Sequence, residues 1–108
     1  MIVAWPGKSG EKYQTVLWKL GDELPNDAGV YIFCKQAIDR SWVQIYVGET
    51  DDFDSRLNIN LTSHHRWDCI VRERATHVCS LTIVGGKKVR LVTETDLRLG
   101  LDPPCNRQ

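Results

Sequence analysis

The chain has 108 residues, 42% hydrophobic and 26% charged, and its 14 Lys and Arg balance its 14 Asp and Glu to a formal net charge of zero. This composition excludes a disordered or fibrous chain, and the length suits one domain with one compact core. The neutral total charge gives no general indication of a nucleic-acid partner. We therefore predict a single ordered domain over residues 1–108.

The N-terminal residues and the cysteines give an expectation about location. Residues 1–7, MIVAWPG, form a short apolar run without basic residues before it, and no segment reaches the roughly 20 apolar residues that cross a bilayer. We therefore expect a cytoplasmic protein with no membrane partner. In such a protein we expect reduced thiols, and no C-x-x-C pair occurs among the four cysteines, Cys34, Cys69, Cys79 and Cys105.

Three segments of the first half favour β-strands. Residues 12–19, KYQTVLWK, follow the turn-like PGKSGE and predict an early strand or hairpin arm. Residues 29–35, GVYIFCK, and residues 42–48, WVQIYVG, are rich in β-branched and aromatic types. Six residues connect these two runs, too few for a crossover helix, so we predict an antiparallel pair at the centre of the sheet.

The segment after Gly48 predicts two short helices. Phe53, Leu57 and Leu61 recur at four-residue intervals, which is typical of an amphipathic helix over residues 55–65. Residues 66–75, RWDCIVRERA, predict a second helix with apolar residues on one side and arginines on the other.

The last third of the chain predicts one strand and one helix. Residues 76–84, THVCSLTIV, predict the strand, and residues 88–101 predict a helix that must end before the Pro103-Pro104 pair. The predicted order of elements is β-β-β-α-α-β-α. This order indicates the α/β (α+β) fold class.

Two tyrosines lie in glycine-containing triplets of neighbouring predicted strands. Tyr31 ends Gly29-Val30-Tyr31, and Tyr46 begins Tyr46-Val47-Gly48. Adjacent strands would bring the two hydroxyls together. A pair of strand tyrosines is more often part of the core, so the triplets alone do not decide between a core and a site.

The two triplets, followed in order by Arg56, Glu94 and Asn106, resemble the GIY-YIG nuclease superfamily. The ten residues from Tyr46 to Arg56, and the twelve from Glu94 to the Asn106 of LDPPCN, are similar to the spacings of that family. PGKSGEKY, HHRW and ATHV look like its small standalone bacterial members, so the resemblance covers nearly the whole chain. It implies a central three-stranded antiparallel sheet flanked by helices, here with an extra N-terminal strand or hairpin.

The resemblance also implies a divalent-metal-dependent DNA endonuclease of low intrinsic sequence specificity. Glu94 would be the one protein ligand of Mg²⁺ or Mn²⁺, and the planar guanidinium of Arg56 would bind the phosphate. Tyr31 would accept a proton from the attacking water, while Tyr46 would position the water or the phosphate. Asn106 would orient a member of the site.

Two positions depart from the pattern of the family. Asn60 stands where the family often carries a histidine or tyrosine, and Glu49 stands where several relatives carry a lysine that could lower a tyrosine pKa. His64 and His65 are candidates for the missing acid or base, with capping of the helix end as the alternative.

DNA is the expected partner, with branched or damaged DNA among the candidate substrates. A second copy of the chain or a partner protein would supply selectivity, because no base-reading helix or zinc finger accompanies the domain. Two alternatives stay open: a catalytically weak or inactive nucleic-acid-binding module of the same fold, and a protein-interaction domain. The candidate nucleic-acid-binding residues are Arg56, Arg66, Lys87 and Lys88.

Overall fold

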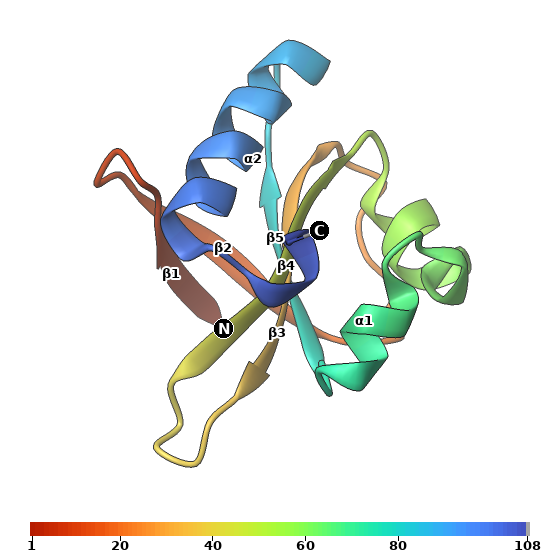
Figure 1. The fold of residues 1–108 in the computed structure, drawn as a ribbon. Helices are drawn as coiled ribbons and strands as arrows, with labels where there is room; N and C mark the ends of the chain where they lie inside the picture. Colours follow the sequence, from red (N-terminus) through yellow and green to blue (C-terminus); the bar gives the residue numbers. More distant parts are fainter. Residues whose placement is uncertain (108) are drawn as a thin grey trace.

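One curved antiparallel sheet forms the centre of the protein, and helical segments lie against both of its faces (Figure 1). The computed structural model describes residues 1–107. The strands follow the spatial order β1-β2-β5-β3-β4, and every neighbouring pair is antiparallel. Their bounds are β1 (Ile2–Pro6), β2 (Lys12–Lys19), β3 (Gly29–Gln36), β4 (Trp42–Thr50) and β5 (His77–Thr82).

The sheet is larger than the predicted three-stranded one, which is therefore not confirmed, although the α+β class is. The N-terminal hairpin β1-β2 joins the same sheet because residues 16–19 of β2 pair with residues 77–80 of β5. The predicted position of the β3-β4 pair at the centre is wrong. The sheet grows only on the β5 side of β3, so β4 is an edge strand.

The helical segments confirm the last predicted helix and shorten the earlier ones. The predicted helix over residues 55–65 is divided at Asn60, whose N–H donates to the carbonyl of Ser55 at 2.9 Å, a π-type bond in place of the α-helical one. Within residues 1–107, no helix is long and apolar enough to cross a membrane. The segments are η1 (Ser55–Ile59, a π-helix), η2 (Leu61–Ser63, 3₁₀), α1 (Trp67–Arg72), α2 (Lys87–Leu101) and η3 (Pro104–Asn106, 3₁₀).

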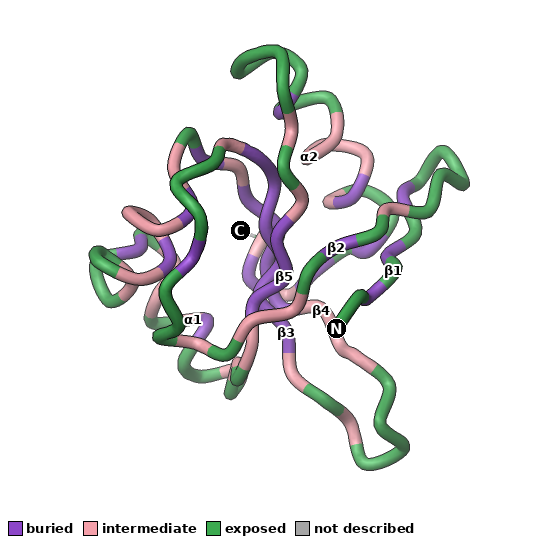
Figure 2. Tube along the Cα trace, turned by 180° about the vertical axis from the view of Figure 1, so that it is seen from behind, coloured by how far each residue is buried: buried purple, intermediate pink, exposed green. Residues whose placement is uncertain are grey.

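The sheet separates two apolar clusters. On one face Phe33 packs with Leu57 of η1 and Ile70 of α1, and on the other face Ile32 packs with Leu97 of α2. The first six residues of β3 are all buried, since successive side chains point into opposite clusters. Figure 2 shows this concentration of buried residues along β3 and β5. The covered strand β3 thus provides a rigid support for its neighbour β4.

Regular strand pairing places Tyr46 on the same sheet face as Tyr31. Tyr31 pairs with Gly48 and Phe33 pairs with Tyr46, so both tyrosines lie on the face of the cluster that contains Phe33. The next residue, Cys34, pairs with Gln44, so Ile45 is an extra residue on β4. This β-bulge adds Ile45 to the same cluster as Tyr46.

A disulfide joins Cys69 of α1 to Cys105 of η3, with their Cα atoms 5.7 Å apart. The expectation of four reduced thiols is therefore wrong for this pair, whereas Cys34 and Cys79 are free and buried. The bonded cysteines are 36 residues apart in sequence, and only the return of the chain after α2 brings them together.

Candidate active site

A cleft of about 260 Å³ opens at the free edge of β4. Because β4 is an edge strand, the cleft reaches both sides of the sheet: the tyrosines face it from the η1 side and Glu94 from α2 on the other side. Four of the five residues that carry the resemblance line this one cleft, and so does His65. The lining residues are Tyr31, Tyr46, Val47, Gly48, Glu49, Arg56, His65, Leu91 and Glu94.

The glycines of the two triplets leave room for aromatic rings. Tyr31 pairs with Gly48 across the strands, and a Cβ on Gly48 would lie 2.6 Å from the Tyr31 hydroxyl oxygen and 2.8 Å from Cε2 of Tyr46. A Cβ on Gly29 would lie 2.6 Å from Cζ of Phe53. In this fold the triplets therefore have a steric cause, the close approach of rings to the backbone.

Each tyrosine hydroxyl is paired with a histidine from the segment after η2. The Tyr31 hydroxyl lies 2.7 Å from Nε2 of His64, and the Tyr46 hydroxyl lies 3.2 Å from Nε2 of His65. The two imidazoles stack with their ring centres 4.6 Å apart. His64 is buried behind Tyr31, whereas His65 is exposed in the cleft. His64 is also the C-cap residue of η2, where its backbone N–H donates to the Leu61 carbonyl at 3.2 Å.

The backbone fixes which nitrogen of His64 carries the hydrogen. The N–H of Arg66 donates to Nδ1 of His64 at 3.0 Å, so Nδ1 is an acceptor. In a neutral imidazole the other nitrogen then carries the hydrogen, and Nε2–H donates to the Tyr31 oxygen. The hydroxyl hydrogen of Tyr31 is left to point into the cleft.

Burial favours the neutral form of all four rings. It raises the pKa of Tyr31, helped by the nearby Tyr46, while the charge and donor groups of Arg56 lower it. Burial and then Glu94 raise the pKa of Tyr46. Burial, with His65 and Arg56 as further causes, lowers the pKa of His64 to about 4. Burial, followed by the charge of Arg56, also lowers the pKa of His65.

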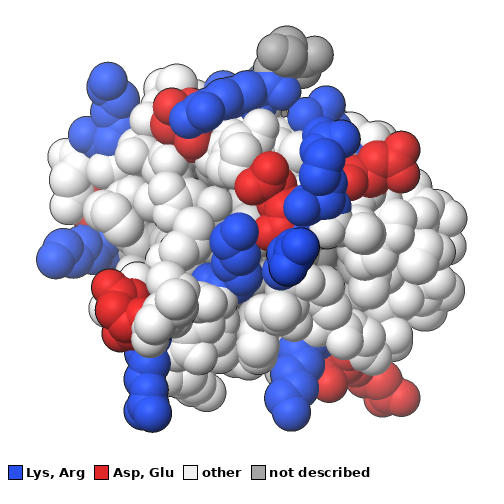
Figure 3. Space-filling model, turned by 60° about the horizontal axis from the view of Figure 1, so that its bottom comes forward, with Lys and Arg blue, Asp and Glu red and all other residues white. Residues whose placement is uncertain are grey.

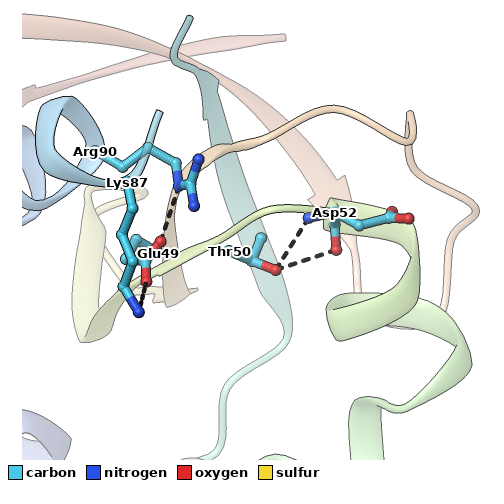
Figure 4. Close-up of polar contacts among 5 residues, drawn as sticks. All are labelled: Glu49, Thr50, Asp52, Lys87 and Arg90. Carbon is cyan, nitrogen blue, oxygen red and sulfur yellow. Dashed lines mark hydrogen bonds and ion pairs between the residues drawn. The ribbon is translucent and has the colours of Figure 1, made fainter. Parts of the chain in front are cut away.

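Two carboxylates on the other side of the cleft are paired with arginines of α2. Glu94 Oε1 accepts from Nε of Arg98 at 3.0 Å. Glu49 Oε2 accepts from Nε of Arg90 at 2.9 Å, and Lys87 lies 4.0 Å from its other oxygen (Figure 4). The charge of Glu49, expected to oppose a lower tyrosine pKa, is thus largely balanced, and Glu49 is the smallest of the causes that act on Tyr31.

Arg90 and Arg98, which bind the two carboxylates of the cleft, were not among the predicted site residues. The spacing of Glu94 and Arg98, four residues apart on a helix, is a signal that could have found the second pair. No local signal links Glu49 to Arg90, because 41 residues separate them.

Arg56 enters the cleft from η1, directly after an ordered turn. Thr50 and Asp52 bond to each other at 3.2 Å through side chain and backbone, as Figure 4 also shows, and the Asp52 carbonyl accepts the N–H of Arg56 at 3.2 Å. Among the described residues, Arg56 forms no salt bridge. It is therefore the cationic group of the cleft whose charge no carboxylate neutralises.

Asn106 lies behind β4 rather than in the cleft. The N–H of Val47 donates to its Oδ1 at 2.8 Å, and its Nδ2 donates to the Val47 carbonyl at 2.9 Å. Both hydrogen-bonding groups of this edge residue are thereby satisfied, and the backbone between Tyr46 and Gly48 is held in place. The predicted orienting role of Asn106 has a geometric basis in these two bonds.

The remaining predicted residues lie outside the cleft. Asn60 lines a neighbouring hollow, and Arg66 lines another next to α1. Lys87 and Lys88 are exposed at the start of α2.

No family model matches the chain, and no curated protein and no solved structure matches it either. The GIY-YIG resemblance therefore stays a prediction that depends on the residues themselves.

The donor groups of the cleft are compatible with a single weakly held divalent ion. Within residues 1–107, no group of three His, Cys, Asp or Glu side chains is arranged to hold a metal. Glu94 offers one carboxylate oxygen that Arg98 does not bind. Mg²⁺ characteristically takes one or two protein carboxylates and completes its shell with waters and phosphate oxygens, so one such oxygen fits it.

Proposed function

We propose that this protein is a divalent-metal-dependent endonuclease that hydrolyses DNA phosphodiester bonds with low intrinsic sequence specificity. The observation that carries the proposal is the presence of Tyr31, Tyr46, Arg56 and Glu94, from four separate elements, in one polar cleft. Phosphodiester hydrolysis needs charge neutralisation at the phosphate, an activated water and help for the departing oxygen. The similarity to the GIY-YIG family supports the same conclusion.

Arg56 and Glu94 would share the phosphate from opposite sides of the cleft. The guanidinium of Arg56, which no carboxylate pairs among residues 1–107, would donate to two phosphate oxygens. Glu94 would hold Mg²⁺ or Mn²⁺ through the oxygen that Arg98 leaves available. When bound, the ion would neutralise charge on the phosphate and on the departing oxygen.

His65 is the group we assign to accept the proton of the attacking water, with Tyr46 between them. The water gives a proton to the Tyr46 oxygen as the Tyr46 hydroxyl hydrogen passes to Nε2 of His65, so hydroxide attacks phosphorus and an imidazolium forms. The lowered pKa of His65, caused by burial and by Arg56, keeps it neutral and ready to accept at pH 7.

Tyr31 takes a positioning role in this scheme, in place of the proton-accepting role that the resemblance implies. Burial raises its pKa, so the phenol is the form present at neutral pH. Its oxygen accepts from His64, and its remaining hydrogen can be donated to a phosphate or water in the cleft.

The deciding experiment is cleavage of supercoiled and branched DNA with Mg²⁺ or Mn²⁺. We expect Glu94→Gln to lower the nicking rate at least about 100-fold, because an amide cannot replace the metal-binding carboxylate. Glu23→Gln is the matched control, since Glu23 is exposed and lies outside the cleft. Equal rates for the native chain and Glu94→Gln would overturn the proposal.

The Glu94–Arg98 ion pair favours a second candidate, a nucleic-acid-binding module without efficient cleavage. In that case the pair satisfies Glu94 without a metal, and Arg56 serves as an anion site alone. No nicking by the native chain, together with DNA binding that Arg56→Gln weakens, would establish this candidate. The cytoplasmic location and a homodimer or partner protein that supplies selectivity stay predictions.

A further inference from the structure

Three hollows meet at His65 on the side of the molecule that carries η2 and α1. The cleft described above is the first, and a second hollow of about 270 Å³ is lined by Arg56, Asn60, Ser63, His64 and His65. A third, of about 220 Å³, is lined by His65, Arg66, Asp68, Cys69 and Arg72. Because His65 borders all three and Arg56 borders two, the hollows adjoin one another from the β4 edge to α1, and together they are called the depression below.

Cationic groups with spare donors line this depression although the whole chain is neutral. Arg66 uses Nη2 to donate to the Arg107 carbonyl at 3.1 Å, but its buried Nε has no hydrogen-bond partner among the described residues. Arg72 is exposed and, within residues 1–107, makes no salt bridge. Figure 3 shows one face of the molecule, on which basic side chains are spread with acidic ones between them.

The α2 side of the cleft offers less to an anion. Lys87 lies 4.0 Å from the carboxylate of Glu49, which offsets its charge. Lys88 lines none of the three hollows. The depression, in contrast, presents arginines in succession, and guanidinium groups suit phosphate oxygens better than ammonium groups do.

We propose that the phosphodiester backbone of a DNA strand runs from the cleft over His65 to Arg66 and Arg72 on α1, rather than along α2 toward Lys87 and Lys88. An extended polyanion fits this depression because the hollows continue one another and each contains an arginine. The identity of the strand rests on the proposed function, but its path rests on the hollows and their charges.

Asp68 allows a test of the proposal in which a substitution should strengthen DNA binding instead of weakening it. Its carboxylate lines the third hollow with Arg66 and Arg72 and, among the described residues, forms no salt bridge. A phosphate in this hollow is repelled by it. Removing the charge should therefore strengthen binding.

The experiment measures fluorescence anisotropy of labelled single-stranded and duplex DNA oligonucleotides with the full chain in EDTA, over a series of salt concentrations. We expect Arg72→Gln to weaken binding about fivefold and to reduce the salt slope by about one. Lys88→Gln removes the same charge from α2 and should change the affinity less than about twofold. Asp68→Asn should tighten binding about two- to fivefold. Circular dichroism confirms folding of each variant.

The outcomes separate the path from the activity. Weakening by Lys88→Gln equal to or greater than that by Arg72→Gln, or no tightening by Asp68→Asn, overturns the path and leaves the nuclease proposal intact. Arg72-dependent binding without metal-dependent cleavage supports the path and overturns the nuclease. A native chain that binds neither oligonucleotide overturns both.

Discussion

The two sides of the cleft hold their polar side chains in place by different kinds of interaction. The tyrosine–histidine wall, made of Tyr31, Tyr46, His64 and His65, is held by hydrogen bonds between neutral rings. The carboxylate wall, made of Glu49 and Glu94 with their arginines, is held by ion pairs.

Burial of the rings and pairing of the carboxylates explain this difference. The tyrosine–histidine wall faces the cluster under η1 and α1, where the low dielectric penalises charge and shifts the pKa of each ring toward its neutral form. The carboxylates of the other wall are also largely enclosed, and they keep their charges because each has an arginine partner. Under the proposed function, the first wall transfers protons and the second binds the metal ion through Glu94.

The largest expected effect comes from the disulfide, because it ties the segments behind the two walls together. Cys69 lies on α1, shortly after His64 and His65, and Cys105 lies on η3, directly before Asn106. Replacing both cysteines by serine should lower the free energy of unfolding by about 3–4 kcal/mol, the value for a loop of this length. Urea unfolding measures this change.

A reductant supplies the control for that prediction. Dithiothreitol should lower the unfolding midpoint of the native chain and leave that of the double serine variant unchanged. Amide exchange at Val47 should accelerate in both, since Asn106 holds its N–H. An unchanged native midpoint in the reductant would contradict the role assigned to the disulfide.

The second prediction concerns the pH dependence of stability that the buried, neutral His64 causes. Unfolded His64 takes up a proton near its ordinary pKa of 6.5, whereas burial lowers its folded pKa to about 4. Between these values the unfolded state binds more protons, so stability falls as pH falls from 6.5 toward 4, by up to about 3 kcal/mol from this group. Above pH 6.5 the contribution is constant.

His64→Gln removes the titration and keeps a side-chain donor for Tyr31. We expect this variant to lose less stability than the native chain between pH 7 and pH 4.5 in urea unfolding. Parallel losses in the native chain and His64→Gln would show that His64 is protonated in the folded state.

Gly48→Ala should break the tyrosine–histidine wall by overpacking. The new methyl would meet both tyrosine rings, which costs about 1–3 kcal/mol and displaces the hydroxyls from the cleft. Gly21→Ala introduces a comparable strain through its positive φ of 93° but meets no atom within 4 Å. DNA cleavage should therefore fall with Gly48→Ala and stay native with Gly21→Ala, and a reversed pattern would contradict the steric explanation.

The smallest expected effects lie in the carboxylate wall. The Arg98 side chain is 39% exposed and pairs within one helix, so Arg98→Gln should cost about 0.3–0.5 kcal/mol. The Arg90 side chain is 10% exposed, so water screens its bond to Glu49 less, and Arg90→Gln should cost about 1–3 kcal/mol. Thermal unfolding of the two variants compares them. Equal losses of stability in the two variants would show that the strength of these ion pairs does not depend on how exposed the arginine is.

Local chemistry made much of the fold predictable. The strands at residues 12–19 and 29–36 follow from their β-branched and aromatic content, and α2 follows from its apolar spacing and the prolines that end it. The predicted N-terminal strand or hairpin is a hairpin, but its first strand, β1, was not located because five residues ending in Pro6 carry too short a pattern. The glycine–tyrosine triplets pointed to Tyr31 and Tyr46 as site residues only together with the resemblance, because the groups that approach Gly29 and Gly48 come largely from other segments.

The other features depend on the assembled fold. The bulge at Ile45 arises from strand pairing, and the division of the helix at Asn60 arises from a backbone hydrogen bond. Neither could be predicted from the residue types at these positions. His64 looked like a surface acid or base, yet its donor is committed to Tyr31 because of the backbone N–H of Arg66. The Cys69–Cys105 bond likewise depends on a close approach of distant segments.

Asn106 has a further consequence for the behaviour of the protein at high concentration. A free edge strand is a template on which another chain can add a strand and begin aggregation. By occupying the N–H and carbonyl of Val47, the amide of Asn106 behaves like one residue of a sixth strand and terminates the sheet. Removal of the residues that follow α2 would therefore expose the edge of β4 to pairing with another chain, and it would also remove the support of the backbone at Val47. We therefore expect this short C-terminal segment to protect the chain from aggregation.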